Sequence, residues 1–533
     1  MLPIFTLSRV QALFKDVYFL LVLTVCAGLV LFKLDDFLLP YFSDELWVYG
    51  PSIRKMGSEI PSMLPSSLAL EDHWAHPMLF FFLGGIWCFV FGTSILSTHV
   101  FAAFLSISLI VIIYLFGKKI FNREVGFYSV LIFGFQTIFH GQFLLVLPEV
   151  LLTIFTFLTI YFYWKGKNIP YLCFAICLVL TKESGVFLIV AIGIWELIKD
   201  CCYDKKKFSF QIFAKKYLLI GLPLAAIGLH ILLLKYTYGW FVLPIRLEHF
   251  EFSWNLYRER IMSSAHYVFI GQGRKPIILV LFVGAIFFHK RYPIWMRIIV
   301  LVVSFSMMKV FFKYWVLPDL FIMITIPVLF IVFLKLVFLD VYKTDKKRGG
   351  VISLFVIFIT LYLLFSSAQF DSLRYLLCIV PIYIIIGLYF TQKIFLFKEL
   401  VLPVVSIIII SFSIFYNIND LNYGDDTNNY SNDCKIRFDA VKFIEDNYKA
   451  TDRINTSFLF QHALYRPLSG YLSTNKVFTN MKSENSVDEG YGVFVFCNME
   501  PSEYYEGIKD NKELKIVQRF EQDNIWVEIY VKK

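Results

Sequence analysis

Long apolar runs separated by short polar connections make up the chain from residue 17 to residue 416. Most of these runs approach the roughly 20 apolar residues that a helix needs to cross a bilayer. The pattern therefore predicts an α-helical polytopic membrane protein with about 13 transmembrane helices, because helices satisfy their own backbone hydrogen bonds in lipid. The predicted spans are 17–33, 95–117, 125–143, 147–164, 169–181, 184–198, 217–235, 276–289, 294–312, 319–338, 351–368, 373–391 and 400–416.

The apolar run 76–92 is excluded from this set of spans. Counting it would invert every later loop and would place the basic connections 118–123 and 335–348 outside the cell. That placement would contradict the excess of Lys and Arg that cytoplasmic loops carry. We therefore expect this run to form a juxtamembrane helix along the outer interface, with Pro77 in its first turn.

Composition supports the membrane assignment and sets its orientation. Of 533 residues, 58% are hydrophobic and 17% are charged, whereas soluble domains carry about 25% charged residues. The net charge of +9 comes from Lys and Arg scattered among short loops, so it does not indicate a nucleic-acid partner. The loop charges predict a cytoplasmic N-terminus and a periplasmic or extracellular C-terminus. Frequent Ile, Phe, Lys and Asn are compatible with a low-GC bacterium and hence with its inner membrane.

The polar segment after residue 416 is expected to form a separate soluble domain. An amphipathic helix is predicted near 438–448, followed by strands at 455–460, 476–479, 493–497, 514–520 and 525–531. The predicted division is a transmembrane catalytic domain, 1–416, whose first outer loop is 34–94, and an extracytoplasmic α/β domain, 417–533. Cys434 and Cys497 could form a disulfide there, but the sequence leaves this open.

An adjacent pair of acids, Asp44-Glu45, follows the first predicted span. Carboxylates at a membrane surface are costly to desolvate, which indicates a functional site. Because neighbouring residues on a helix point roughly 100° apart, the two acids would not share one task. One is expected in the catalytic centre, and the other is expected to orient neighbours or cap a helix. The alternative is that Asp44 only N-caps an interfacial helix over 45–56.

Further charged residues are predicted at the same outer face. Glu149 follows Pro148 at the start of a span, Lys182 lies in a turn between two short spans, and Arg374 precedes Tyr375 at a span end. Each residue also has an explanation without a catalytic role. Glu149 could be stabilised by the helix dipole, Lys182 could extend its charged end to the membrane surface, and Arg374 could anchor a lipid headgroup. Together, however, these residues offer cations that could hold a phosphate leaving group and a carboxylate that could take a proton from a hydroxyl.

The histidines of the first outer loop suggest a second kind of site. Glu71, Asp72 and His73, with His76 nearby, could bind a divalent cation such as Mg²⁺ or Mn²⁺. Their spacing matches no tight metal motif, and interfacial histidines without a metal are the more common case.

Six motifs in order resemble the GT-C membrane glycosyltransferases of the protein O-mannosyltransferase and lipid A aminoarabinose-transferase type. The resemblance covers about residues 15–200 and, less closely, 365–385. The motifs are SDELWVYGPSIRKMG, HPMLFFFLGGIWCFVFG, YLFGKKIFNREVG, LPEVLLTIF, LVLTKES and LRYLLCIVP.

The resemblance implies a GT-C fold and an inverting transfer of sugar from a polyprenyl-phosphate donor to an acceptor on the extracytoplasmic face. It also implies that Asp44 is the catalytic carboxylate, with Glu45 as its partner. Lys182 and Arg374 would contact the lipid phosphate, in a donor site to which His76, Glu149 and Tyr375 are also assigned. The lipid-phosphate sugar would be a substrate and not a cofactor, and the only cofactor considered is the possible divalent metal described above.

Two other function classes stay open at this point. A flippase for a polyprenyl-linked sugar would also need cations for a phosphate, although its polar residues should line a path near mid-membrane. A non-catalytic cell-envelope assembly protein would tolerate the loss of Asp44. The sugar and the acceptor, whether lipid A, a protein or a surface glycan, are not readable from the sequence.

Overall fold

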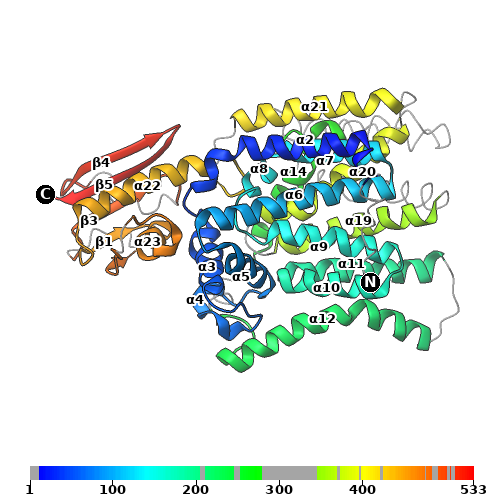
Figure 1. Ribbon diagram of the computed structural model, residues 1–533, viewed down its shortest axis with the longest axis horizontal. Helices are drawn as coiled ribbons and strands as arrows, with labels where there is room; N and C mark the ends of the chain where they lie inside the picture. Colours follow the sequence, from blue (N-terminus) through cyan, green and yellow to red (C-terminus); the bar gives the residue numbers. More distant parts are fainter. Residues whose placement is uncertain are drawn as a thin grey trace.

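The computed structural model describes residues 11, 13–203, 210–244, 253–278, 345–368, 372–394, 398–419, 424–473, 476–482, 490–500, 505 and 511–533. Within these residues, the long apolar helices lie side by side, and a small domain of mixed helices and strands follows at one end (Figure 1). The predicted fold class, a helical membrane bundle with a small C-terminal α/β domain, is confirmed.

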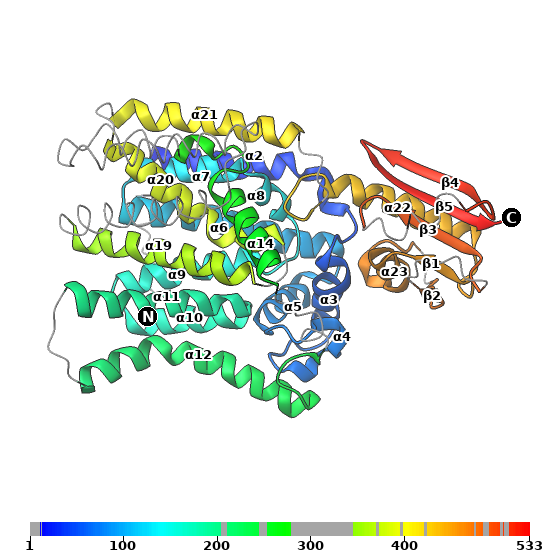
Figure 2. The ribbon, with the colours of Figure 1, turned by 180° about the vertical axis from the view of Figure 1, so that it is seen from behind.

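The helical bundle is built mainly from long, apolar helices. Its helices are α2 (Val17–Phe32), α6 (Ile95–Ile120), α7 (Arg123–Gly134), α8 (Thr137–Gln142), α9 (Glu149–Trp164), α10 (Asn168–Thr181), α11 (Val186–Ile198), α12 (Phe210–Tyr238), α14 (Trp254–Phe269), α19 (Lys346–Ser366), α20 (Val380–Ile394) and α21 (Lys398–Asn419). Short turns η4 (Glu183–Gly185), η5 (Lys199–Tyr203) and η7 (Leu373–Cys378) join or precede some of them. Seen from behind, α14 lies beside α19 and α20 (Figure 2), against which it packs.

Four of the described helices are long and apolar enough to cross a membrane by themselves, namely Ile95–Ile120, Ala214–Tyr238, Lys346–Ser366 and Glu399–Asn419. The protein is therefore an integral membrane protein. Shorter apolar helices occupy the predicted spans near α2, α9 and α10. The predicted spans 294–312 and 319–338 lie outside the described residues, as does 276–289 beyond its first three positions.

The predicted span 125–143 was wrong as a single helix. The chain leaves the helical conformation at Gln136, which separates α7 from α8. The Gln136 side chain is buried, and it donates to Ser413 Oγ at 3.0 Å and accepts a hydrogen bond from the Arg274 guanidinium. Buried polar groups require such partners, so this polar position takes an extended backbone between two short helices.

The first loop folds into short helices at one end of the bundle (Figure 1). These are η1 (Leu34–Leu38), η2 (Glu45–Tyr49), α3 (Gly50–Gly57), η3 (Pro65–Ser67), α4 (Leu70–His73) and α5 (Leu79–Phe91). Helix α5 packs against α3 and α6, and it begins two residues after Pro77, which therefore does not lie in its first turn. The contact with α3 is close, because a Cβ at Gly57 would lie 2.3 Å from the Cys88 Cβ.

The C-terminal domain carries a five-stranded sheet with the strand order β2-β1-β3-β5-β4. Strand β1 is parallel to β2 and β3, whereas β5 is antiparallel to β3 and β4. Its elements are α22 (Tyr430–Asn447), β1 (Ile454–Thr456), α23 (Phe458–Tyr465), η8 (Pro467–Ser469), β2 (Met481–Lys482), β3 (Val493–Cys497), β4 (Leu514–Gln522) and β5 (Ile525–Lys532). Cys434 and Cys497 are buried free thiols.

Two of the predicted strands in this domain were wrong. The second half of 455–460 belongs to helix α23, because Phe460, Ala463 and Leu464 are buried at helical spacing. No strand forms at 476–479, and β2 begins at Met481 instead. Helix α22 also begins at Tyr430, eight positions before the predicted start. Strands β3, β4 and β5 confirm the other predictions.

The C-terminal domain rests on the first loop. Arg466 forms an ion pair with Asp72 at 3.3 Å, and the backbone N–H of Tyr41 donates to the carbonyl of Ser469 at 3.1 Å. At the start of α22, the buried Lys33 ammonium lies 4.7 Å from the centre of the Tyr430 ring. The first loop and the C-terminal domain therefore lie at the same end of the bundle (Figure 1).

Candidate active site

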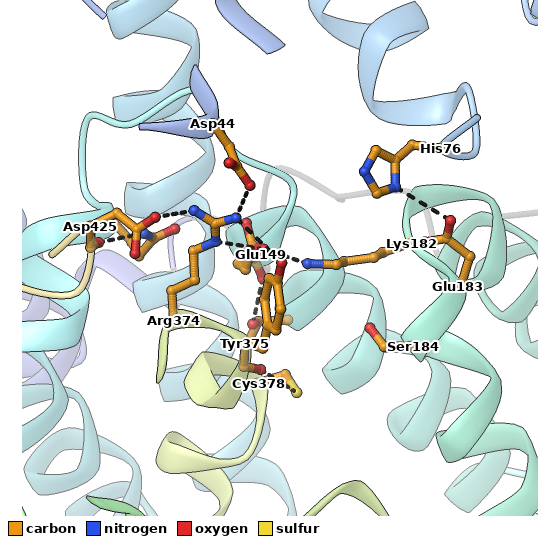
Figure 3. A network of polar contacts seen from close by, with 12 residues as sticks. Asp44, His76, Glu149, Lys182, Glu183, Ser184, Arg374, Tyr375, Cys378 and Asp425 are labelled. Atoms are coloured by element: carbon orange, nitrogen blue, oxygen red, sulfur yellow. Dashed lines mark hydrogen bonds and ion pairs between the residues drawn. The ribbon is translucent and has the colours of Figure 1, made fainter. Parts of the chain in front are cut away.

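Five charged side chains from distant parts of the chain meet at the end of the bundle that carries the first loop (Figure 3). They are Asp44 of the first loop, Glu149 at the start of α9, Lys182 between α10 and α11, Arg374 of η7 and Asp425 of the loop before α22. Three of the predicted donor-site residues, Glu149, Lys182 and Arg374, are thus close to Asp44.

Arg374 is the centre of this cluster. Its guanidinium donates hydrogen bonds to the carboxylates of Asp44 and Asp425, and its Nε lies 3.5 Å from Glu149 Oε1. The side chain is only 4% exposed. A planar guanidinium can bind several carboxylate or phosphate oxygens at once, so this arginine is the natural anchor for an anionic group.

Lys182 supplies the second cation of the cluster. Its Nζ lies 2.6 Å from Glu149 Oε1 and 3.5 Å from the centre of the Tyr375 ring. The backbone of Lys182 is extended, which interrupts the helices α10 and α11 and turns the side chain toward α9. Oε2 of Glu149 is buried without a hydrogen-bond partner among the described residues.

The turn before Asp44 aims its carboxylate at Arg374. Ser43 takes a left-handed backbone conformation with φ of 52°, which is uncommon for a residue with a side chain. Trp47 Nε1 then donates to Asp44 Oδ1 at 3.0 Å, and Arg374 occupies Oδ2. Asp44 makes no capping bond to the backbone of η2, so the alternative that it is only an N-cap is wrong.

The structure separates Glu45 from the cluster. The Glu45 side chain is fully buried and accepts hydrogen bonds from the backbone N–H of Phe42 at 3.1 Å and of Val146 at 2.8 Å. Its Oε1 also lies 3.2 Å from His99 Nε2. Glu45 therefore holds the first loop against α6 and the segment before α9, and it acts as a positioning residue beside Asp44.

Asp425 is a site residue that the sequence analysis missed. Besides Arg374, its carboxylate accepts a hydrogen bond from Ser43 Oγ at 3.1 Å, and its carbonyl accepts one from Gln142 Nε2 at 2.6 Å. The available signal was the pair Asp425-Asp426 directly after the last apolar run. Nothing in a one-dimensional pattern links that pair to Arg374, which lies 51 positions earlier.

Two of the acids on Arg374, Asp44 and Asp425, differ in their tendency to bind a proton. Burial raises the pKa of the Asp44 carboxyl, but the charge and hydrogen bond of the Arg374 guanidinium, together with Lys182 and His76, lower it by more, so this pKa lies below its usual value. Burial also raises the pKa of Asp425, and although Arg374 opposes this, the nearby Asp44 carboxylate helps to keep that pKa above its usual value. As the pH falls, the Asp425 carboxylate is therefore protonated before the Asp44 carboxylate.

The cluster holds three carboxylates and two cations, so it carries one negative charge when all five groups are ionised. A phosphate that binds Arg374 must compete with carboxylates that already occupy it. Asp425 lies in the loop before α22, so it can move away more readily than Asp44, which directly precedes η2, or Glu149, which begins α9.

His76 and Tyr375 lie at the edge of this cluster (Figure 3). His76 Nδ1 is 3.3 Å from Glu183 Oε1, and the His76 ring stacks on Tyr49 with a centroid distance of 5.8 Å. Tyr375 stands between the two cations, 5.1 Å from the Arg374 guanidinium carbon. Their assignment to a donor site stays a prediction.

The predicted metal ligands of the first loop do not fit a metal ion. The Asp72 carboxylate pairs with Lys55 at 2.7 Å and with Arg466 at 3.3 Å. His73 lies 2.9 Å from the Tyr238 hydroxyl and accepts from the backbone N–H of Ala75. Glu71 is exposed. Across the described part of the chain, no three His, Cys, Asp or Glu side chains are grouped for metal binding.

The fold and this cluster define a polytopic membrane protein with a charged site at one end of its helices. Residues 75–227, which are 153 of 533, match the family described as dolichyl-phosphate-mannose-protein mannosyltransferase. The match confirms, over this segment, the resemblance to the GT-C membrane glycosyltransferases. A comparison with curated proteins finds no match.

Solved structures give more distant likenesses. ArnT from Cupriavidus metallidurans bound to undecaprenyl phosphate is 11% identical, with a TM-score of 0.49 over 96% of this chain and 97% of that chain. The archaeal oligosaccharyltransferase AglB from Archaeoglobus fulgidus, in complex with an inhibitory peptide and a dolichol-phosphate, is 11% identical, with a TM-score of 0.45 over 91% and 70%.

Proposed function

We propose that this protein is an inverting glycosyltransferase that moves a sugar from a polyprenyl-phosphate donor to an acceptor hydroxyl at the membrane face that carries Asp44. The observation that supports it is the meeting of Asp44, Lys182 and Arg374 from three distant segments. The family match over residues 75–227 supports the same class of reaction. The acceptor, be it lipid A, a protein or a surface glycan, is left to experiment.

The two cations hold the donor phosphate in this proposal. Lys182 and Arg374 neutralise the charge that grows on the phosphate as the bond between its oxygen and the anomeric carbon breaks. The polyprenyl phosphate leaves with the electron pair of that bond. Because a phosphate is already a good leaving group, no general acid is required, and the base and the cations carry most of the catalysis.

Asp44 takes the proton of the acceptor hydroxyl. As the acceptor oxygen bonds to the anomeric carbon from the side opposite the phosphate, its proton passes to an Asp44 carboxylate oxygen, and the configuration inverts. In the free protein, Arg374 keeps Asp44 a weak base by lowering its pKa. A donor phosphate that takes over Arg374 would relieve this effect and raise the basicity of Asp44 only when donor is bound.

Asp425 has a different role in the proposal. It holds the Arg374 guanidinium in place through Nη1 while the site is empty of donor, and the donor phosphate then displaces it. The C-terminal domain thus contributes to the site through the loop before α22. Asp425 is a positioning residue, because it acts on the donor through Arg374.

The experiment compares Asp44→Asn with a matched variant, Asp35→Asn. Asp35 is an exposed carboxylate of the same loop, outside the cluster. Purified full-length proteins are given polyprenyl phosphate carrying a labelled sugar together with a cell-envelope extract as acceptor. Loss of the base should slow transfer by about 10²- to 10⁴-fold in Asp44→Asn. Transfer by Asp35→Asn should match the wild type.

Two results would contradict the proposal. Undiminished transfer by Asp44→Asn would exclude Asp44 as the base. A wild-type protein that binds the donor but neither transfers nor hydrolyses its sugar would instead favour a carrier or an assembly protein. Thermal unfolding of each variant separates a lost proton acceptor from a lost fold.

A further inference from the structure

A cavity lined by lysines and by apolar and aromatic residues lies at the end of the bundle remote from Asp44. It has a volume of about 560 Å³ and is lined by the end of α9, the start of α10, the end of α11 and the first turns of α12 and α19. Figures 1 and 2 place these helix ends opposite the C-terminal domain. A cavity of this size can hold a small polar headgroup. None of the residues that form the candidate active site line it.

Lysine is the most frequent residue type in the wall of this cavity. Five lysines line it, against one carboxylate from Glu196. Lys199 and Lys216 are paired with that glutamate, and Lys216 also pairs with Asp200 at 2.5 Å. The other three, Lys167, Lys346 and Lys347, make no ion pair with any residue that the structure describes. Cations therefore outnumber carboxylates by three even when Asp200 is counted.

Two features indicate that positive charge around this cavity is not fully compensated. Burial and the neighbouring lysines Lys119, Lys347 and Lys167 together lower the pKa of Lys165, which lies between the lining residues Trp164 and Gly166. In addition, Lys346 and Lys347 occupy the first turn of α19. The helix dipole disfavours cations at that position. An anion between these groups would relieve both effects.

Aromatic side chains form another part of the wall. Trp164 and Trp195 line the cavity together with Tyr163 and Tyr171. The indole Nε1 of Trp164 is buried and has no hydrogen-bond partner among the described residues. Tryptophan and tyrosine are enriched at the level of lipid headgroups, where one edge of the ring is apolar and the other is wet. The cavity thus combines cations, a spare N–H donor and apolar ring faces at a helix-bundle end.

We propose that this cavity binds the phosphate headgroup of an anionic membrane phospholipid. Lys167, Lys346 and Lys347 would hold the phosphate oxygens, Trp164 Nε1 would donate to one of them, and the acyl chains would run along the bundle surface toward the membrane interior. Basic pockets between transmembrane helices bind anionic headgroups in this way. The proposal does not depend on the glycosyltransferase reaction, since no residue is shared between the two sites.

The test measures thermal unfolding of the full chain in neutral detergent while phosphatidylglycerol is titrated in. The pocket variant is Lys346→Gln/Lys347→Gln. Its matched control is Lys215→Gln/Lys393→Gln, which removes the same charge from exposed positions at the same end but outside the cavity. Parallel titrations use phosphatidylcholine, which has no net charge, and inorganic phosphate, which has no acyl chains.

Phosphatidylglycerol should raise the unfolding temperature of the wild type and of the control in a saturable manner. The pocket variant should require about 30-fold more lipid for half saturation, given the usual contribution of two basic side chains near an anionic lipid. An equal response to phosphatidylcholine would overturn the proposal, as would an equal loss in the control. Inorganic phosphate acting at the same concentrations would identify a soluble anion instead of a lipid.

A single substitution guards against a folding defect in the double variant. Lys167 is exposed, so Lys167→Gln should leave the fold intact. It is compared with Lys393→Gln, and it should weaken the response to phosphatidylglycerol by about fivefold. An unchanged response in Lys167→Gln would count against the proposal.

Discussion

Replacing Asp425 by Asn removes one negative charge from the guanidinium of Arg374 without changing the shape of the side chain. The cluster then becomes neutral, because Asp44 and Glu149 balance Lys182 and Arg374. If the donor phosphate binds Arg374 where Asp425 now lies, the variant should bind donor more tightly. Asp44 remains in place, so the chemical step should change little.

The size of this effect follows from the geometry. A phosphate and the Asp425 carboxylate bound to neighbouring nitrogens of one guanidinium would lie about 5 Å apart, and two like charges at that distance repel by about 3 kcal/mol at an effective dielectric constant near 20. The Asp425 side chain is 11% exposed, so this dielectric constant is appropriate. Movement of the loop would relieve about half of the repulsion, which leaves roughly a tenfold fall in the KM for donor.

The assay is steady-state transfer of a labelled sugar, in which kcat and the donor KM are measured separately. Asp44→Asn is the matched variant, because it removes the same charge from the same guanidinium. It should lose kcat by about 10²- to 10⁴-fold, whereas Asp425→Asn should keep kcat within about tenfold of the wild type.

The pH dependence gives a further readout. The pKa of Asp425 is raised, so its carboxylate is protonated as the pH falls, while Asp44, whose pKa is lowered, stays ionised. The donor KM of the wild type should therefore fall as the pH is lowered, and that dependence should disappear in Asp425→Asn. A rise of the donor KM in Asp425→Asn would refute the reasoning, because Asp425 would then support the phosphate and not compete with it.

Three other substitutions test the same site. In Gly141→Ala, the new Cβ would lie 2.8 Å from the backbone N of Thr427 and 2.9 Å from the Asp425 carbonyl, so the loop must retreat. Its unfolding free energy should fall by about 1 kcal/mol and its donor KM should fall as well, whereas Gly134→Ala, whose Cβ would meet Val25 at 3.4 Å, should behave as wild type in the same assays. Arg374→Met leaves three carboxylates with only Lys182 and should destabilise the protein by about 3–5 kcal/mol in thermal unfolding at pH 7. Because unpaired buried carboxylates have raised pKa values, this loss should shrink as the pH falls, and a loss that grows instead would contradict the charge balance. Lys182→Met should lower kcat/KM for donor by about 10²- to 10³-fold in the transfer assay, and an unchanged value would remove Lys182 from the phosphate site.

Most of the candidate site could be predicted because membrane topology restricts where charges can lie. Glu149, Lys182 and Arg374 each follow or precede an apolar run, and a charge at such a position must lie near a membrane surface. Counting the runs places these residues at the same surface as Asp44. The prediction that they lie near one another needed no knowledge of packing.

Other features of the site and fold depended on local backbone geometry, which the pattern of apolar and polar residues does not reveal. Asp44 and Glu45 are adjacent in the sequence, yet the left-handed turn at Ser43 directs one to Arg374 and the other into the core. The segment before Tyr465 was predicted in part as a strand, but it forms helix α23, in which Phe460 and Leu464 are both buried. The boundary between the two predicted domains at residues 416 and 417 stays a prediction.

The amino-acid sequence alone determined that this is a helical membrane protein with charges gathered at helix ends, because hydrocarbon excludes charged side chains and permits long apolar helices. Only the tertiary structure decided which charges meet. Arg374 pairs with Asp44 across 330 positions, and Asp425 joins them from a loop without apolar periodicity. Pairing depends on distances of a few ångströms between packed segments, and those distances arise only once the whole bundle has formed.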